Sequence, residues 1–547
     1  MDYYDLGNYS CKITTTSPEA QIWFDRGLNW IYAYNHESAI DCFKNALQAD
    51  PDCAMAHWGI AYAIGPNYNK PWEAFESDEK AEALALALAS VAKAEGLTGA
   101  VTDTERALIE AVHHRYPQDA GVEDFAPWND AYADAMREVH AKHSQNLDVC
   151  TLFAEALINR TPWQLWDLPT GQPAVGASTV EAVAVQEAAF ENVEGAWSHP
   201  GLLHMYIHTM EMSPTPEKAL RPGDCLYALG MEAGHLLHMP THVDVLCGDY
   251  ENVVARNRTA VVADRKFLER EGAENFYSIY RMHNLHFVVY GAMFLGQPEP
   301  ALEAAEELKT AIPEGYLREM VDWFEGFIPM KLHVLIRFGR WQEILDEELP
   351  ADAELYATTT AMMRYARTVA LANTKRLVEA EAERKLFFEA RDAVPESRTL
   401  FNNSCHDILA IAEQMMLGEL EYHKGNHDQA FEHLRKSVEL DDNMPYDEPW
   451  GWMQPTRHAL GALLMEQGHF EEAEAIYRAD LGLDSTLSRA CQHPGNVWSL
   501  HGLHECLERR GESVEAAHIK LQLDKAVARA AVPVNASCYC RSVASAA

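Results

Sequence analysis

The chain has 547 residues, of which 48% are hydrophobic and 23% charged, a composition typical of a folded globular protein. Its 83 acidic residues outnumber its 44 basic residues, giving a formal net charge of -39 at pH 7. Because such a surface repels phosphate groups, the composition argues against a nucleic-acid binder and against a protein that binds anionic membranes.

The N-terminal composition leads us to expect an intracellular protein. Its N-terminus, MDYYDLGNYSCKITTTSPEA, lacks the basic start and apolar run of a secretory signal, and no run of roughly 18 or more apolar residues occurs. The 11 cysteines are scattered without a CxxC pair, as is typical of proteins in a reducing compartment. We therefore predict a cytoplasmic protein that binds neither nucleic acid nor membrane.

Helix-pair repeats begin near the N-terminus. In the first of them, small residues such as Gly27 and Ala39 let two helices approach closely, and Pro51 ends the second helix. Residues 79–96 and 379–393 are apolar along one helical stripe, and alternating β-branched runs are scarce. The first repeat has the spaced large, small and helix-stopping residues of a tetratricopeptide repeat: Trp23, Gly27, Ala39, Phe43, Ala46 and Pro51.

The same arrangement returns twice near the C-terminus, with matching positions 43 residues apart. We therefore predict an all-α, tetratricopeptide-like solenoid that forms one continuous array over residues 1–547, with a histidine-rich groove segment at 199–333 and a mobile tail at 535–547. Residues 161–178 and 441–455, rich in Pro, Gly and Trp, are predicted loops, and they either wall a pocket or plug the ends of the solenoid. The two C-terminal repeats carry Gly418, Gly425, Ala430 and Leu434, then Gly461, Gly468, Ala473 and Tyr477.

Histidines are concentrated in the middle of the chain, where eight of the 25 lie between His199 and His286. His204 and His208 are four residues apart with Glu211 three further on, which places all three on one face of a helix. His238 and His242 repeat the four-residue spacing, and His235 precedes them by three residues.

The histidines also share a register with the turn glycines. His235 and His238 lie 13 and 10 residues before Gly248, and His283 and His286 lie 13 and 10 residues before Gly296. In tetratricopeptide arrays these offsets on the first helix of a pair line the concave groove, so we expect the histidine-bearing helices to converge there. His242 and His333 share another offset, each six residues before its turn glycine.

This pattern predicts a transition-metal site. Neutral imidazole suits Fe, Cu, Ni or Zn, and a helix presents two imidazoles at i and i+4 to one ion. The excess of ligands leaves open a dinuclear site or one ion surrounded by titrating histidines, and a groove that binds an anion without metal is a further alternative. The predicted ligands are His204, His208, Glu211, His238, His242 and His283, and the predicted catalytic groups are His286 and His235.

Several segments resemble a group of large tetratricopeptide-like proteins of bacteria and fungi. The most specific are HPGLLHMYIHTMEMSP and AGHLLHMPTHVDVLCGDY, which carry the motifs HPGxxHxYIHxxE and AGHLxHMPTH. The resemblance covers most of the chain. It implies the repeat fold and brings no activity or metal with it.

Two classes of function follow from the sequence. The first is a metalloenzyme acting on a small molecule, with Fe or Cu in an oxidoreductase favoured over Zn in a hydrolase. The second is a tetratricopeptide scaffold that binds a protein or peptide partner in its groove without metal. Histidine and glutamate at the groove offsets, where a scaffold for acidic peptides would offer Lys, Arg and Asn, favour the enzyme.

Overall fold

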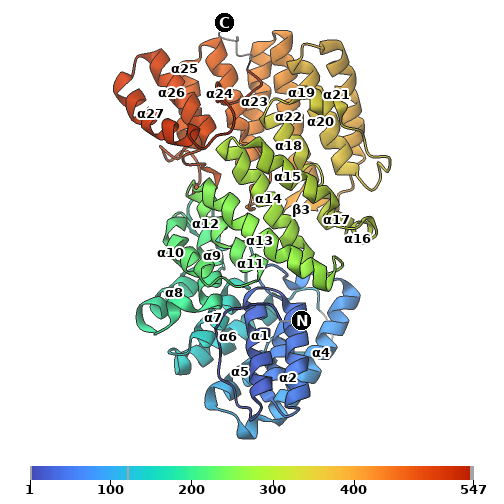
Figure 1. Cartoon of the computed structure of the whole chain (residues 1–547), viewed down its shortest axis with the longest axis vertical. Helices are drawn as coiled ribbons and strands as arrows, with labels where there is room; N and C mark the ends of the chain where they lie inside the picture. The colour runs from blue at the N-terminus through green and yellow to red at the C-terminus, as the bar shows by residue number, and fades with distance from the viewer. Residues whose placement is uncertain (1–2, 120–121, 542–547) are drawn as a thin grey trace. The chain divides into compact units, whose positions relative to one another are not determined.

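The computed structural model describes residues 3–119 and 122–541. The chain divides into two compact units, Met1–Val243 (unit 1) and Asp244–Ala547 (unit 2). Helices build both units, and the strands among the described residues form two short antiparallel hairpins (Figure 1). The predicted all-α, tetratricopeptide-like solenoid is therefore confirmed, and the continuity of the array across residue 243 stays a prediction.

Unit 1 consists of consecutive helices that pack against their neighbours in sequence, beginning with α1 against α2 and α2 against α3. The helices are α1 (Pro18–Tyr32), α2 (His36–Ala49), α3 (Ala54–Ala63), η1 (Trp72–Ala74), α4 (Ser77–Gly96), η2 (Thr98–Ala100), α5 (Asp103–His113), α6 (Ala126–His143), α7 (Leu147–Ile158), α8 (Thr179–Asn192), η3 (Ala196–Ser198), α9 (Pro200–Glu211), η4 (Pro216–Ala219), α10 (Leu220–Ala228), α11 (Gly234–His238) and α12 (Pro240–Leu246), which runs across the boundary.

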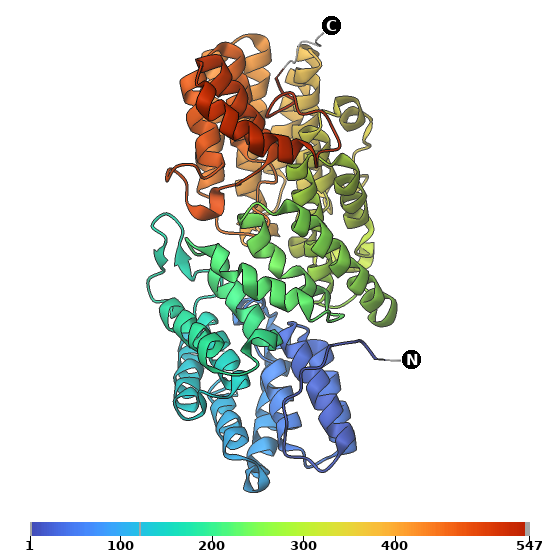
Figure 2. The same ribbon diagram turned by 60° about the vertical axis from the view of Figure 1, so that its left-hand side comes forward.

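Unit 2 continues in the same manner. Figure 2 shows its C-terminal helices, coloured orange to red, packed side by side. The helices are α13 (Tyr250–Glu271), α14 (Ser278–Leu295), α15 (Pro298–Thr310), α16 (Glu314–Glu319), α17 (Val321–Phe324), η5 (Glu325–Phe327), α18 (Met330–Arg337), α19 (Trp341–Asp346), α20 (Ala357–Asn373), α21 (Leu377–Asp392), α22 (Cys405–Lys424), α23 (His427–Asp442), α24 (Thr456–Gln467), α25 (Phe470–Asp480), η6 (Arg489–Cys491), α26 (Val497–Arg510) and α27 (Ser513–Val527).

Glycine allows the paired helices to pack closely, as the repeat pattern predicts. A Cβ added to Gly461 on α24 would lie 2.6 Å from the Tyr477 ring on α25, and one added to Gly502 on α26 would lie 2.2 Å from the same ring. Gly27 on α1 and Phe43 on α2 make the equivalent contact in unit 1, at 2.6 Å. Real Cβ atoms do not approach ring carbons this closely, so each contact requires glycine.

One predicted loop contains a hairpin, and the other, at 441–455, contacts a hairpin through the hydrogen bond from Asn403 to Asp447 (2.8 Å). Residues 161–178 hold the hairpin of β1 (Trp166–Asp167) and β2 (Gln172–Pro173), and β3 (Thr399–Leu400) pairs with β4 (Asn403–Ser404) in unit 2. In the tail predicted to be mobile, the carbonyl oxygen of Ser537 accepts a hydrogen bond from Arg337 and the Arg541 side chain pairs with Glu505. The last part of that tail, residues 542–547, lies outside the described residues.

One helical segment among the described residues, Ser77–Ala100, is long and apolar enough to cross a membrane by length and composition alone. A third of its most apolar window, 33%, is buried. Because the core helix of a soluble protein meets the same criteria, this segment is weak evidence for a membrane span.

Candidate metal centre

Helix α9 carries the first histidine pair. His199 is its N-cap and accepts a hydrogen bond from the Leu202 amide through Nδ1 (3.0 Å), and Pro200 occupies the first helical position. The four-residue spacing then places His204 and His208 one turn apart on the same face, with their Nε2 atoms 3.0 Å apart.

Helices α11 and α12 carry the second pair. Pro240 cannot donate a backbone hydrogen bond, and α11 ends just before it while α12 begins with it. His238 is the last residue of α11 and His242 lies on the first turn of α12, so the four-residue spacing brings their Nε2 atoms to 2.7 Å. The interruption between α11 and α12 therefore leaves the histidine pair intact.

Hydrogen bonds to the opposite ring nitrogens fix the tautomers of the first pair. Nδ1 of His204 lies 2.7 Å from the Tyr32 carbonyl oxygen, and Nδ1 of His208 lies 3.1 Å from Glu211 Oε1. A carbonyl or carboxylate oxygen can only accept, so each Nδ1 carries the proton. Each Nε2 therefore presents a lone pair, and the two lone pairs face each other.

The second pair is held in the same way. Nδ1 of His242 lies 2.8 Å from Glu211 Oε2, so one carboxylate accepts from both pairs. The Thr241 hydroxyl donates to the His238 carbonyl oxygen (2.7 Å) and lies 3.4 Å from His238 Nδ1, which leaves its oxygen to accept from that nitrogen. The Nε2 atoms of this pair also present facing lone pairs.

Facing lone pairs are the arrangement that a shared cation stabilises. Two nitrogen ligands at about 2.0–2.1 Å from one ion lie about 3.0 Å apart at a right angle and about 3.4 Å apart in a tetrahedron. The observed separations of 3.0 and 2.7 Å need at most about 0.3 Å of widening for a right angle, and about 0.4 and 0.7 Å for a tetrahedral angle. Each pair can therefore chelate one ion.

His235 completes a set of three around the first pair. Ligand atoms of His204, His208 and His235 all lie within 4.8 Å of one another, as do those of His208, Glu211 and His242. The His235 ring centroid lies 4.9 Å from that of His204 and 6.0 Å from that of His238. His235 thus lies between the two pairs.

The cluster is withdrawn from solvent. His204, His208 and His238 are 0% exposed, and Glu211, His235 and His242 are 1% exposed. Burial lowers the pKa of His204 to about 3 and lowers the pKa of His208 well below its usual value. Both rings therefore stay neutral near pH 7, which is the form that binds metal.

A second layer of hydrogen bonds supports the Tyr32 carbonyl group. The Tyr32 hydroxyl donates to Asp148 (2.6 Å), which also accepts from Tyr9 (2.7 Å) and from His199 Nε2 (3.2 Å). Burial raises the pKa of Asp148, but the hydrogen bond and charge of His199 and the two hydroxyl groups lower it to about 2. This network anchors both α1 and α9 next to the first pair.

Three aromatic rings cover the first pair, and only one of them lies in a segment that we predicted as a possible pocket wall. The Tyr34 ring centroid lies 4.8 Å from that of His204 and 5.7 Å from those of His208 and His235. Tyr68 and Trp163 lie 4.8 and 6.1 Å from the His208 ring. Trp163 comes from the predicted loop at 161–178, whereas no spacing marked Tyr34 or Tyr68.

The backbone at two of these aromatic residues is strained. Tyr34 and Trp163 adopt left-handed φ angles of 54° and 59°, a region that non-glycine residues rarely occupy. Such strain persists where the surrounding structure requires a particular side-chain position. Both rings contact His208, so the strain occurs where the structure covers the histidines.

The remaining predicted residues lie in unit 2. His283 and His286 are on α14, and His286 Nε2 lies 2.8 Å from the Met453 sulfur. Burial lowers the pKa of His286 to about 3. The predicted roles of His283 as a ligand and of His286 as a catalytic group stay predictions.

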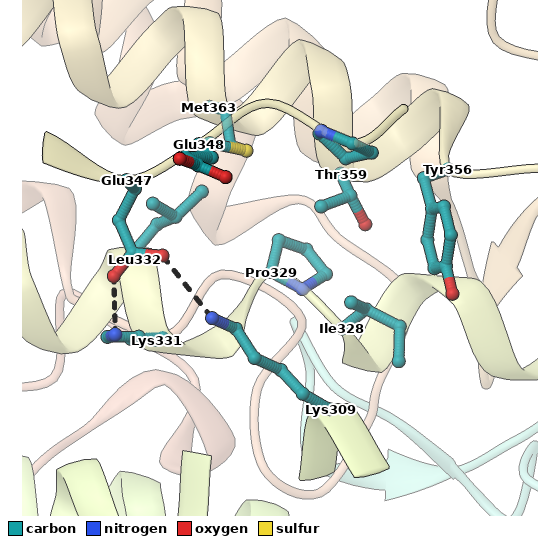
Figure 3. A pocket seen from close by; sticks show the side chains of 11 residues that line it. Lys309, Ile328, Pro329, Lys331, Leu332, Glu347, Glu348, Tyr356, Thr359 and Met363 are labelled. Atoms are coloured by element: carbon teal, nitrogen blue, oxygen red, sulfur yellow. Dashed lines mark hydrogen bonds and ion pairs between the residues drawn. The ribbon is translucent and has the colours of Figure 1, made fainter. Parts of the chain in front are cut away.

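Unit 2 also contains a cavity of about 260 Å³ between α15, α18, α20 and the segment that follows α19 (Figure 3). Its wall is mostly apolar, and its lysines are paired: Lys309 Nζ lies 3.3 Å from Glu347, which also pairs with Lys331. Neither lysine is left as an uncompensated cation for an anionic ligand.

Comparisons with known proteins bear on the fold. A tetratricopeptide repeat model matches residues 414–444, which cover most of α22 and α23. No curated protein matches the chain. Among the solved structures to which the chain is similar, three are compared below, and each comparison covers most of this chain.

The first is Naa15/Naa10 bound to HypK-THB, with 13% identity, TM-score 0.24, and coverage of 93% of this chain and 72% of that chain. The second is the TPR domain of P58(IPK), with 11% identity, TM-score 0.20, and coverage of 90% and 99%. The third is the APC/C hetero-tetramer Cut9–Hcn1, with 12% identity, TM-score 0.25, and coverage of 93% and 96%. The repeat match and the helix pairs together identify a tetratricopeptide-like solenoid.

Proposed function

We propose that unit 1 binds transition-metal ions through two histidine pairs, His204 with His208 and His238 with His242, and that His235 completes the ligand set. The observation that carries this proposal is the state of the four paired rings. Nδ1 of His204, His208 and His242 faces a carbonyl or carboxylate oxygen, and Nδ1 of His238 lies 3.4 Å from the Thr241 hydroxyl. With the ring protons assigned to Nδ1 on these contacts, the Nε2 lone pairs converge in a buried site. Without a cation, the facing lone pairs of neutral rings repel each other.

The two pairs favour two ions. Glu211 is placed to orient ligands, because both of its oxygens face Nδ1 atoms of the rings that would bind metal. Carboxylates that accept from ligating histidines fix ring orientation and strengthen the ligand. The sequence predicted Glu211 as a ligand, and we instead assign it the orienting role in this proposal.

The donor set favours redox chemistry. Imidazole nitrogens with open positions suit Fe or Cu in oxygen-dependent reactions, and we propose an oxidoreductase that acts on a small molecule. Zinc in a hydrolase uses the same kind of ligands and is the competing version. The identity of the metal that the protein retains distinguishes the oxidoreductase from the hydrolase.

Asparagine variants give a sharp test. Asparagine can keep a donor near the Nδ1 position while removing Nε2, so His204→Asn with His242→Asn deletes one ligand from each pair and retains donors toward Tyr32 and Glu211. His57→Asn on α3 is the control, because His57 is buried but belongs to none of the metal-ligand groups.

The measurement is metal content by plasma mass spectrometry after reconstitution with Fe, Cu or Zn. We expect two equivalents in the parent and the control and almost none in a folded double variant. Equal content in all three proteins would rule out the proposed site. Retention of Fe or Cu, followed by oxygen uptake with candidate substrates, would support the oxidoreductase version.

A scaffold is the second candidate function. The tetratricopeptide repeat at 414–444 lies in unit 2, and such repeats commonly bind peptides. The mostly apolar cavity of Figure 3 lies in the same unit. If the parent protein takes up no metal, this candidate replaces the enzyme.

A further inference from the structure

A second group of buried polar side chains surrounds Tyr62 on α3, in unit 1. The Arg115 guanidinium carbon lies 4.3 Å from the Tyr62 ring centroid. The Trp58 ring is stacked on the Tyr62 ring, with 5.4 Å between the ring centroids. The Tyr62 hydroxyl donates to Glu155 Oε2, and the His36 ring lies 6.4 Å away. We call these five residues the Tyr62 cluster.

Several polar atoms of this cluster have no partner. Among the residues that the structure describes, Arg115 Nη1, Glu155 Oε1 and Trp58 Nε1 make no hydrogen bond, and neither does His36 Nε2. Arg115, Glu155 and Trp58 are only 4%, 1% and 2% exposed. An unsatisfied buried polar group destabilises the folded state, so several around one ring point to a missing ligand.

Arg115 is the dominant member. Its Nη2 donates to the Pro66 carbonyl oxygen, and its charge interacts with the Glu155 carboxylate of the same cluster. Its Nη1 makes no hydrogen bond among the described residues. A buried charge is costly unless it is paired and hydrogen-bonded. A ligand carboxylate would accept from Nη1 and form a direct ion pair.

The other open atoms define the rest of the ligand. Trp58 Nε1 can only donate, and it offers the carboxylate a second partner. Glu155 Oε1 accepts when the carboxylate is ionised, and it would receive a hydroxyl or amino group on the ligand. Because Glu155 also repels negative charge, the cluster favours a monoanion over a phosphate dianion.

Two short segments connect this cluster to the histidine pairs. Tyr34 contacts His204 and His208, and His36 lies two residues later, with ring centroids of Tyr34 and His36 6.3 Å apart. In the second segment, Pro66 accepts from Arg115 and Tyr68 packs against His208. The Tyr62 cluster and the metal ligands are therefore neighbours in unit 1.

We propose that the Tyr62 cluster binds the carboxylate end of the small molecule on which the metal centre acts, and that this molecule is a hydroxy- or amino-carboxylate. This inference rests on the proposed function for the role of the metal. Carboxylate binding by Arg115 stands on the cluster alone.

The probes are acetate, glycolate and glycine, which share a carboxylate but differ in the donor beside it. Their binding to metal-free and Co²⁺-loaded protein is measured by calorimetry, and the visible cobalt spectrum is recorded in the same samples. We expect glycolate or glycine to bind more tightly than acetate and to shift the cobalt bands. The metal content of each sample is determined in parallel.

Three substitutions remove one contact each. Arg115→Met is expected to weaken binding at least about tenfold, and Trp58→Phe about three- to tenfold, which corresponds to one hydrogen bond. Glu155→Gln is expected to reduce the difference in affinity between acetate and glycolate. It removes the negative charge that repels the carboxylate, and it changes the group that accepts from the hydroxyl or amino group of the ligand. Trp128→Phe on α6 is the control, since Trp128 packs against Trp72 and Phe125.

The outcomes separate the two proposals. If Arg115→Met does not fold, Trp58→Phe still reports, because Trp58 Nε1 has no hydrogen bond to lose. Probe binding that is absent, or unchanged in both variants, while metal loading is normal overturns the inference alone. Arg115-dependent binding in a protein that takes up no metal overturns the metal centre and leaves the carboxylate site. Binding that leaves the cobalt bands unmoved overturns the link between the two sites.

Discussion

Glu211→Gln is expected to separate metal binding from folding. In the parent, one carboxylate accepts from Nδ1 of both His208 and His242. A glutamine in the same place can accept from one ring through its oxygen and must donate to the other ring through its amide group. That second ring then carries its proton on Nε2.

The change has opposite effects on the two states of the protein. With Nε2 protonated, the altered ring donates to its partner across the existing 3.0 or 2.7 Å separation, so the metal-free protein keeps its hydrogen bonds. The same proton blocks chelation at that pair. Loss of an orienting partner typically costs 10–100-fold in metal affinity, or about 1.4–2.7 kcal/mol.

The assay is competition for the metal against a chelator, together with thermal unfolding of the metal-free protein. We expect one of two ions to bind about 10–100-fold more weakly, with little change in the metal-free melting temperature. Glu187→Gln is the matched control, because Glu187 on α8 accepts from Tyr206 on α9, the helix of Glu211, but within the described residues is not paired with a histidine. Unchanged affinity for both ions in Glu211→Gln would refute the orienting role.

Three further predictions concern stability. Burial lowers the pKa of His333 from 6.5 to about 3. The folded state therefore binds fewer protons than the unfolded state, and stability is lost as pH falls below about 6.5. At pH 5 the loss of folding free energy is about 2 kcal/mol. His333→Phe should therefore reduce the difference in melting temperature between pH 7.5 and pH 5, and an unchanged difference would contradict this. Gly461→Ala and Gly502→Ala should each destabilise the protein by about 1–3 kcal/mol in denaturant titrations, because both crowd the Tyr477 ring. Gly96 has open space around it, so Gly96→Ala should be neutral or stabilising. Equal effects at all three sites would be inconsistent with the packing. The pKa of Asp148 is lowered to about 2, so its contribution to folding stability is present above about pH 4. Asp148→Asn should therefore cost about 2 kcal/mol of stability at pH 7, measured by calorimetry. No loss at pH 7 would show that the hydroxyl and imidazole contacts contribute nothing.

Local patterns in the sequence predicted the repeat fold and the two histidine pairs of the candidate metal centre. The i, i+4 spacings of His204 with His208 and of His238 with His242 are consequences of helix geometry, and both pairs are formed. The glycine and aromatic positions of the repeats likewise predicted the close helix contacts, as at Gly461.

The sequence did not predict the contacts that depend on tertiary packing. The carbonyl group of Tyr32 orients His204 across 172 residues of chain, and Glu211 reaches His242 on a different helix. Tyr34 and Tyr68 lie in turns after helices, where no hydrophobic period marks a side chain as part of a site. Their position depends on how α1, α3 and α9 pack together.

The stoichiometry of metal binding tests the central claim most directly. The metal-free parent is titrated with Co²⁺ or Cu²⁺ beside two variants, each with both histidines of one pair replaced by asparagine. The account predicts two equivalents in the parent and one in each variant, with His57→Asn unchanged. A single equivalent in the parent that either variant abolishes would contradict two separate pairs, and uptake that no variant alters would contradict the metal centre.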